Sequence, residues 1–342
     1  MTTPQTEPQT TPQTETTPQT ETESAPPAQP RRNQIDFGIY VPQVAFSYDD
    51  ILRRARTVEE LGFHSLWLYD HLYAPMLPET PSLEGWTLAS FLLAQTTRLR
   101  LGHLVLCNNF RHPALLAKMA TTLDVCSNGR FELGLGSGSV EEEHLQAGLP
   151  WGSFPERSAR LGEALEIITN MFEQEVTSFS GRHYELHDVP NRPLPVQSPR
   201  PPIHVGGMGP RYTLPLVARY ADVWNIPTYG LADWEAKEKV LESECAKIGR
   251  DPVTIRRSHE AVLVLAADDR ELATAQEKAG RRFRGATWGL DAGGYIGTPE
   301  MLVERIGQAI EQGITFFVFF THDRADPRTL ELFAERVMPA FS

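Results

Sequence analysis

The sequence has few cysteines, no long hydrophobic run and no excess of basic residues. Its three cysteines, Cys107, Cys126 and Cys245, are far apart and form no Cys-x-x-Cys motif, which fits the reducing cytoplasm better than a disulfide framework. No apolar stretch reaches the roughly 18 residues of a membrane span. The net charge of −12 argues against nucleic acid or an anionic membrane as a partner, because either would normally require a basic face.

Motifs for metal binding and for cysteine chemistry are missing as well. No two histidines have the His-x-x-x-His spacing within a predicted helix, the arrangement that places two metal ligands on one helix face. Cys107 has no neighbour in the local sequence that would activate its thiol, which argues against a nucleophilic role. We therefore expect no metal site and no covalent chemistry at this cysteine.

The first 33 residues differ in composition from the rest of the chain. The motif Pro-Gln-Thr-Glu starts at Pro4, Pro12 and Pro18, and no Lys or Arg occurs before Arg31. Such a segment cannot offset its ordering entropy by burial, so we expect a disordered acidic tail. The chain is 41% hydrophobic and 22% charged, enough to bury a sizeable core, and we expect residues 34–342 to form a single domain.

From Ile35 onward, strand and helix patterns alternate. The apolar run Ile35–Val41 is followed by a helix that Ser47 opens and Gly62 ends. Eight such units favour a parallel (β/α)8 TIM barrel of the α/β class, with functional groups on the loops that follow the strands; a doubly wound sheet is the alternative. The other expected strands are Ser65–Tyr69, Leu99–Cys107, Phe131–Leu135, Ile203–Gly206, Ala221–Ile226, Arg256–Ala266 and Thr315–Phe320.

A long insertion, about residues 139–201, separates the fourth and fifth expected strands. It contains a predicted helix from about Glu156 to Glu173 and a predicted hairpin around Ser180 and Gly181. Insertions of this length are often lids or substrate-binding segments. The candidate lid residues are Trp151, Phe154 and His183; the alternative is that these rings only pack the insertion onto the barrel.

The fifth expected strand runs into a glycine turn, Gly206-Gly207-Met208-Gly209, ahead of a predicted helix. Glycine adopts backbone angles closed to other residues and lets a ligand approach the main chain. If Pro210 is the first helical residue, free amides and the positive end of the helix dipole favour an anion, most often a phosphate. The alternative is a turn that needs glycine only for steric reasons.

Polar residues follow three other expected strands. Asp70 and His71 follow the second strand, where the imidazole could exchange a proton or bind a polar cofactor edge, unless the pair is a helix cap beside a surface histidine. Asn108 and Asn109 follow the third strand and suit either a heterocycle or a turn. The glycines that follow the fourth strand, Gly134 to Ser139, have Gly-x-Gly-x-Gly spacing and precede three glutamates, which argues against a Rossmann dinucleotide site.

These segments together resemble the luciferase-like monooxygenase superfamily, and most closely its branch that uses the deazaflavin coenzyme F420. The resemblance rests on Trp67–His71, Leu101–Asp124, Gly129–Gly138 and Ile203–Asn225, and extends from about Phe37 to the C-terminus. It implies a (β/α)8 barrel that holds the isoalloxazine-like ring in its mouth, and a homodimer. It also implies a non-prolyl cis peptide between Leu104 and Val105, behind the ring.

The resemblance assigns expected roles to individual residues. His71 would lie beside the ring as the catalytic residue, the turn from Gly206 to Gly209 would cradle the phosphate, and the end of the third strand would back the ring. The expected cofactor-binding residues are Asp70, Leu104, Val105, Cys107, Asn108, Gly136, Ser137, Gly138, Ser139, Gly206, Gly207, Met208 and Gly209.

The chain departs from the family pattern after the fourth strand. The family commonly has Gly-Trp there, and some members have a catalytic glutamate, whereas this chain has Gly138-Ser139; the later glutamate of the motif is retained as Glu143. The substitution puts a proton-transfer role at position 139 in doubt and predicts a roomier or differently polar pocket.

The resemblance predicts an F420-dependent oxidoreductase that moves a hydride between C5 of the deazaflavin and a small organic molecule, with His71 as proton donor or hydrogen-bond partner of the cofactor. One alternative is an FMN-dependent monooxygenase served by a separate reductase. Another is a non-catalytic flavin-binding barrel, which the retention of His71 beside the ring and phosphate loops disfavours.

Overall fold

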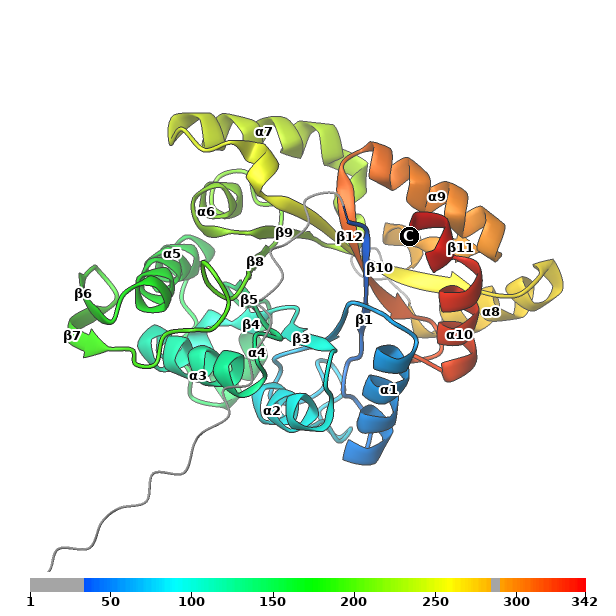
Figure 1. The fold of residues 1–342 in the computed structure, drawn as a ribbon, viewed down its shortest axis with the longest axis horizontal. Helices are drawn as coiled ribbons and strands as arrows, with labels where there is room; N and C mark the ends of the chain where they lie inside the picture. Colours follow the sequence, from blue (N-terminus) through cyan, green and yellow to red (C-terminus); the bar gives the residue numbers. More distant parts are fainter. Residues whose placement is uncertain (1–33, 284–289) are drawn as a thin grey trace, which may run out of the picture.

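A computed structural model describes residues 34–283 and 290–342, so the predicted tail lies outside the described residues. Within these ranges, parallel strands close into an eight-membered barrel surrounded by helices (Figure 1), because the last strands pair back onto the first. The predicted (β/α)8 barrel is confirmed, and the doubly wound sheet is wrong. In spatial order the barrel strands are β1 Asp36–Tyr40, β2 Ser65–Leu68, β3 Arg100–His103 with β4 Leu106–Cys107, β5 Phe131–Gly136, β8 Ile203–Gly206, β9 Val223–Ile226, β10 Arg256–Leu265 and β12 Ile314–Thr321.

The third barrel strand is interrupted. The run Leu99–Cys107 was expected as one strand, but the structure divides it into β3 and β4 around a cis peptide bond between Leu104 and Val105. The predicted cis bond is therefore confirmed. β3 pairs with β2 and β5, and β4 pairs with β5, so both pieces keep the same place in the barrel.

The helices of the barrel follow the strands as the apolar patterns predict. The first helix is opened by a capping box in which Ser47 and Asp50 exchange hydrogen bonds, and Gly62 follows it with φ of +80°. A short strand, β11 Tyr295–Gly297, pairs with β10 outside the barrel and was not expected. The helices are α1 Tyr48–Glu60, α2 Gly85–Gln95, α3 Pro113–Cys126, α6 Thr213–Tyr220, α7 Trp234–Lys247, α8 Asp269–Arg282, α9 Pro299–Glu311 and α10 Pro327–Arg336.

The insertion contains a helix and a hairpin, as predicted. Its elements are α4 Glu141–Gln146, α5 Phe154–Glu173 and the antiparallel pair β6 Val176–Ser180 and β7 Glu185–Pro190. α5 packs against α3, and the hairpin lies beyond them at the edge of the molecule (Figure 1). The Glu163 carboxylate on α5 accepts hydrogen bonds from the backbone N–H groups of residues 182, 183 and 184, which fastens the hairpin turn to the helix.

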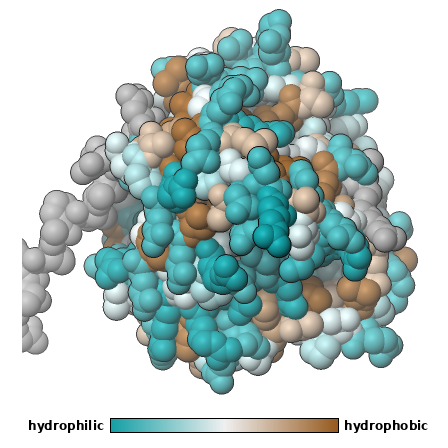
Figure 2. All heavy atoms as spheres, turned by 90° about the vertical axis from the view of Figure 1, so that its right-hand side faces the viewer, coloured by the Kyte–Doolittle hydropathy of each residue, from teal (hydrophilic) through white to brown (hydrophobic). Residues whose placement is uncertain are grey.

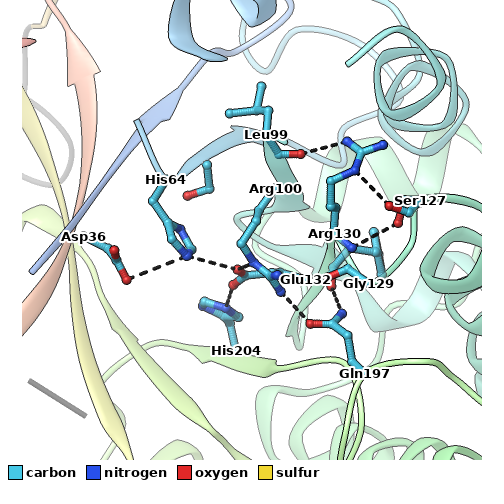
Figure 3. A network of polar contacts seen from close by, with 12 residues as sticks. Asp36, His64, Leu99, Arg100, Ser127, Gly129, Arg130, Glu132, Gln197 and His204 are labelled. Atoms are coloured by element: carbon cyan, nitrogen blue, oxygen red, sulfur yellow. Dashed lines mark hydrogen bonds and ion pairs between the residues drawn. The ribbon is translucent and has the colours of Figure 1, made fainter. Parts of the chain in front are cut away.

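The barrel interior has distinct layers. Charged residues at the N-terminal ends of the strands form a buried network around Glu132 (Figure 3), which includes Asp36, His64, Arg100 and His204. An apolar cluster formed by Trp67, Leu104, Val223, Phe316 and Val318 packs against this network. The C-terminal ends of the strands form the mouth, where the fold places functional groups.

The outer surface carries mainly polar side chains. Figure 2 shows the face that includes α8, α9 and α10, where hydrophilic residues cover most of the area and hydrophobic residues occur in small groups. No helix within residues 34–283 and 290–342 is long and apolar enough to cross a membrane.

Candidate active site

The barrel mouth brings together the loops singled out in the sequence. His71 follows β2, the 3₁₀ turn Asn108–Phe110 follows β4, the segment Gly136–Ser139 follows β5, and the glycine turn follows β8. β5 lies between the β3–β4 strand and β8, so three of these loops leave adjacent strands at the same end of the barrel.

His71 is held by a buried carboxylate. Its Nδ1 lies 3.0 Å from Oε2 of Glu143, and the other oxygen of Glu143 accepts a hydrogen bond from the Leu72 N–H. Glu143 is only 1% exposed, whereas a quarter of the His71 side chain is exposed. A neutral imidazole that donates Nδ1–H to Glu143 has Nε2 as its acceptor, so the pair fixes both the ring orientation and the tautomer.

The helix-cap interpretation of Asp70 and His71 is wrong. The next helix, α2, is capped by Glu84, and Asp70 instead forms two hydrogen bonds with Arg111, of 2.7 and 2.9 Å. Asp70 also accepts the Cys107 N–H at 2.8 Å. Its partners are protein groups, and it fixes the loop after β2 against the end of β4.

Cys107 has a partner that the local sequence did not reveal. Its Sγ lies 3.3 Å from Nε2 of His144, whose Nδ1 lies 2.7 Å from the Val140 carbonyl oxygen. Burial raises the pKa of the thiol to about 12, so the sulfur stays protonated and is unsuited to nucleophilic attack. A Cβ on Gly138 would lie 3.0 Å from this sulfur, which accounts for glycine at that position.

Val105 occupies the space between β5 and β8. A Cβ on Gly136 would lie 2.7 Å from Cγ2 of Val105, and a Cβ on Gly206 would lie 3.2 Å from Cγ1. Glycine on both neighbouring strands therefore lets the Val105 side chain close the inner wall of the mouth. This is the position at which the resemblance places the back of the cofactor ring.

The glycine turn presents free amides, although not all of those expected. The Gly207 N–H donates to the Asn225 carbonyl on β9 at 3.1 Å, and Gly207 has φ of +114°. Within the described residues, the N–H groups of Met208, Gly209 and Arg211 have no hydrogen-bond partner. These amides fit an anionic group such as a phosphate.

The helix after this turn begins later than predicted. Pro210 was considered as a possible first residue, but residues 210–212 form a turn and α6 begins at Thr213. The Gly209 carbonyl accepts the N–H groups of both Thr213 and Leu214. Pro210 has the fixed φ that suits a turn as well as a helix start, which is why the sequence did not separate the two.

Asn108 and Asn109 line a cavity of about 480 Å³ between the end of β4, α5 and the tip of the hairpin. Asn108 Nδ2 lies 3.4 Å from the Tyr184 hydroxyl, and both polar atoms of the Asn109 side chain are buried without a partner in the described part of the chain. Both residues also belong to a 3₁₀ turn. The turn and the cavity thus use the same two residues, so the two interpretations are compatible.

The candidate lid residues differ in their contacts. Trp151 packs on His144 with ring centroids 4.6 Å apart, and Phe154 packs on Tyr212 at 5.6 Å. Phe154 joins the insertion to the turn before α6, whereas Trp151 packs within the insertion and lies beside Gly138, so the packing interpretation is favoured for both rings. His183 lines the cavity beside Asn109, and its Nε2 is buried without a partner among the described residues.

Sequence analysis missed a polar cluster on the inner wall. Asn225 Nδ2 on β9 lies 3.4 Å from Glu260 Oε2 on β10, and Ser258 Oγ lies 3.4 Å from Asn225 Oδ1. Tyr40 on β1 is partly buried beside them, and desolvation followed by the charge of Glu260 raises its pKa. The available signal was Glu260 itself, a charged residue directly before the apolar run from Ala261 to Ala266.

Comparisons with known proteins agree with this geometry. Residues 22–288 match the family described as luciferase-like monooxygenase. The chain belongs to this family. It is 29% identical over 340 residues to an F420-dependent glucose-6-phosphate dehydrogenase of Microbacterium testaceum, covering 89% of this chain and 96% of the relative. An F420-dependent glucose-6-phosphate dehydrogenase of Beutenbergia cavernae is 31% identical over 327 residues, covering 86% and 94%.

A third relative is an F420-dependent hydroxymycolic acid dehydrogenase of Mycobacterium tuberculosis, 29% identical over 263 residues, covering 74% of this chain and 69% of the relative. These matches confirm the family and its F420-dependent branch as identified from the sequence. As a member of this family the protein is an oxidoreductase.

Solved structures share the fold. An F420-dependent secondary alcohol dehydrogenase in complex with an F420–acetone adduct superimposes with a TM-score of 0.74 at 20% identity, covering 90% of this chain and 99% of the other. The F420-dependent tetrahydromethanopterin reductase of Methanopyrus kandleri gives 0.72 at 18% identity, covering 90% and 100%. At these identities the likeness concerns the fold alone.

Proposed function

We propose that this protein is an F420-dependent dehydrogenase that interconverts an alcohol and its carbonyl compound. The observation that carries the proposal is the His71–Glu143 pair, which lies at the same end of the barrel as the free amides of the glycine turn. The relatives support the substrate class, because their names describe dehydrogenases of glucose-6-phosphate and of hydroxymycolic acid.

The residues of the mouth fit the cofactor in two places. Val105 and the side-chain-free positions Gly136 and Gly206 form a wall against which a flat ring can pack. The free N–H groups of Met208 and Gly209 suit the phosphate that follows the ring in F420. When bound, F420 supplies a carbon that accepts or donates a hydride.

In this proposal His71 handles the proton that accompanies the hydride. Glu143 orients the imidazole and stabilises a positive charge on it, so Nε2 can accept the substrate hydroxyl proton in the oxidative direction and return it in the reductive direction. The burial of Glu143 keeps this orientation independent of solvent.

A cofactor titration tests the proposal. The purified protein is titrated separately with F420 and with FMN, and binding is followed by absorption and fluorescence; we expect saturable binding of F420 and much weaker binding of FMN. F420 reduction is then assayed with a panel of primary and secondary alcohols. Preference for FMN would favour the monooxygenase alternative, for which a separate reductase would be required. Binding of neither would overturn the proposal.

Several expectations stay predictions. They are the individual cofactor-binding residues, the single domain from residue 34 to residue 342, the homodimer and the cytoplasmic location. A small molecule as substrate agrees with the relatives.

A further inference from the structure

Glu260 is a buried carboxyl group on the inner wall of the mouth, for which the mechanism above has no use. It lies on β10, three strands around the barrel from β2, and is 5% exposed. Its Oε2 is 3.4 Å from Nδ2 of Asn225. The same amide nitrogen lies 3.9 Å from where a Cβ on Gly206 would stand, and that position is 3.2 Å from Val105. The Asn225 side chain therefore lies between Glu260 and the wall of Val105 and Gly206 that is proposed to back the ring.

The groups that face Glu260 are neutral. In the described part of the chain they are Asn225 from β9, Tyr40 from β1 and Tyr229 from the turn after β9. Thr228 donates to the main-chain carbonyl of Glu260, and the strand neighbour on β12 is Val318. Within the described ranges no Lys, Arg or His forms an ion pair with it. Burial raises the pKa of Glu260 to about 7, and only the hydrogen bond from Asn225 opposes this.

Other buried carboxylates of the barrel have compensating partners. Asp36 pairs with Arg256 at 2.6 Å, and Asp70 pairs with Arg111. Glu132 lies 2.5 Å from both Arg100 and His204. A carboxyl group that served only to fill the core would be expected to have such a partner or to be replaced by an apolar residue, because an unpaired buried charge is costly. The position of Glu260 therefore needs another explanation.

We propose that Glu260 is a proton-exchanging carboxyl group of the substrate pocket, which compensates for the absence of an acidic residue at Ser139. The inference rests on the proposed function. In the oxidative direction the hydroxyl proton of the alcohol moves to the Glu260 carboxylate, while the carbon-bound hydrogen leaves with its electron pair to F420, and the C–O bond becomes a carbonyl. The carboxylic acid then releases its proton to solvent. In this arrangement Glu260 takes the hydroxyl proton that the proposed function gives to His71, and the His71 imidazole, oriented by Glu143, hydrogen-bonds the cofactor edge instead. The reductive direction reverses each transfer.

The protonation of Glu260 can be followed without substrate. Infrared spectra of the cofactor-free protein are recorded from pH 5 to pH 9, and the carboxylic acid C=O band is compared between the wild type, Glu260→Gln and Ser258→Ala. Glu260→Gln preserves shape and removes only the charge; Ser258→Ala alters the same cluster and keeps the carboxyl group. We expect a band that is lost with a midpoint near 7 in the wild type and in Ser258→Ala, and that is missing in Glu260→Gln.

A second arm asks whether the carboxyl group faces the site. Saturating F420 is added and the titration repeated; a pocket residue should shift its midpoint by about half a pH unit or more, because the ligand displaces water and adds charge. A titration that depends on Glu260 and is displaced by F420 supports the inference. A carboxyl group that stays in one protonation state across the range, or a midpoint unchanged by F420, overturns it.

Activity separates the inference from the proposed function. With an alcohol found active in the panel, the acidic limb of the kcat/KM profile should disappear in Glu260→Gln, and kcat should fall by about 10²-fold. F420 affinity should remain within a few fold of the wild type. If the wild type fails to bind F420, the proposed function fails; if it binds and turns over but Glu260→Gln keeps the wild-type pH profile and kcat, only the inference fails.

Discussion

Glu132 and Glu260 are both glutamates on barrel strands, both are almost fully buried, and they lie at opposite ends of the barrel. For Glu132, burial alone would raise the pKa, but Arg100 and His204 outweigh burial and hold the pKa well below its usual range (Figure 3). For Glu260, burial is opposed only by Asn225, and the pKa rises to about 7. The same residue type is thus fully ionised at one end and poised for proton exchange at the other.

The two ends of the barrel differ in how their polar groups are paired. Charges at the N-terminal end are satisfied by one another and by backbone groups, which is the pattern of a structural network. The mouth keeps a carboxyl group without a cation and backbone amides without acceptors in the described part of the chain. Groups left unsatisfied in this way suit ligands and reacting atoms.

The largest effect should come from His71 at the mouth. His71→Ala is expected to lower turnover by a factor on the order of 10² to 10⁴, because it removes the imidazole that the proposed reaction uses. Its free energy of unfolding, measured in urea, should fall by about 1 to 3 kcal/mol, because the buried Glu143 carboxylate keeps only the Leu72 N–H as a partner. Glu143→Gln should reduce turnover less, since an amide oxygen can still accept the Nδ1–H bond. Turnover within a few fold of wild type in His71→Ala would contradict the role.

Glu132 should show the opposite pattern. Glu132→Gln is expected to lower the free energy of unfolding by about 3 to 5 kcal/mol, because it removes the carboxylate that pairs with Arg100, which is three-quarters buried, and with the fully buried His204. The Glu132 pKa is depressed in the folded state, so its contribution is present above the unfolded pKa near 4.5 and is lost as pH falls through the folded value. F420 affinity of the folded variant should be unchanged.

Arg281→Ala is a matched control for this loss. It breaks an ion pair with Glu277 whose side chains are 73% and 66% exposed, and such pairs contribute little. If Glu132→Gln were no less stable than Arg281→Ala, the network at the N-terminal end would not have the structural role assigned to it.

Glu260→Gln should change how stability depends on pH. The folded pKa of about 7 lies above the unfolded value of 4.5, so between these values the unfolded chain has released a proton that the folded protein still holds. Stability from this group is therefore full below pH 4.5 and declines as pH rises to about 7, by at most about 3 kcal/mol. Glu260→Gln should be more stable than wild type at pH 8 and similar at pH 4.5, measured by urea unfolding at both values. Parallel stability curves would show that the carboxyl group does not titrate in this window.

The sequence predicted the barrel because its signals are local. Alternating apolar runs and the Ser47 cap specify strands and helices over short distances, so most strand ends agree within two residues. The motif around His71 was also found, since its residues are adjacent in the chain.

The missed contacts depend on which strands and loops become neighbours in the folded barrel. Glu260, Asn225 and Tyr40 come from three strands far apart in sequence, and no local pattern indicates that they meet. The Cys107–His144 contact similarly joins β4 to the insertion. Sequence reasoning places side chains on strand ends, but it does not pair them across a barrel.

The smallest expected effect compares two glycines at opposite ends of the barrel. Gly207 has φ of +114° and lies in the glycine turn after β8, while Gly62 has φ of +80° and follows α1 at the other end. A Cβ on Gly207 would lie 3.4 Å from the Thr213 side chain, and a Cβ on Gly62 would meet nothing within 4 Å.

Both Gly207→Val and Gly62→Val force a β-branched residue into the left-handed region, which should lower the free energy of unfolding by about 1 to 3 kcal/mol. Only Gly207→Val should also weaken F420 binding, by about 10- to 100-fold in Kd, because its side chain crowds the free amides at Met208 and Gly209. Fluorescence titration of both variants with F420 distinguishes an effect of backbone strain from an effect on binding. Equal Kd values for the two variants would contradict phosphate binding by this turn.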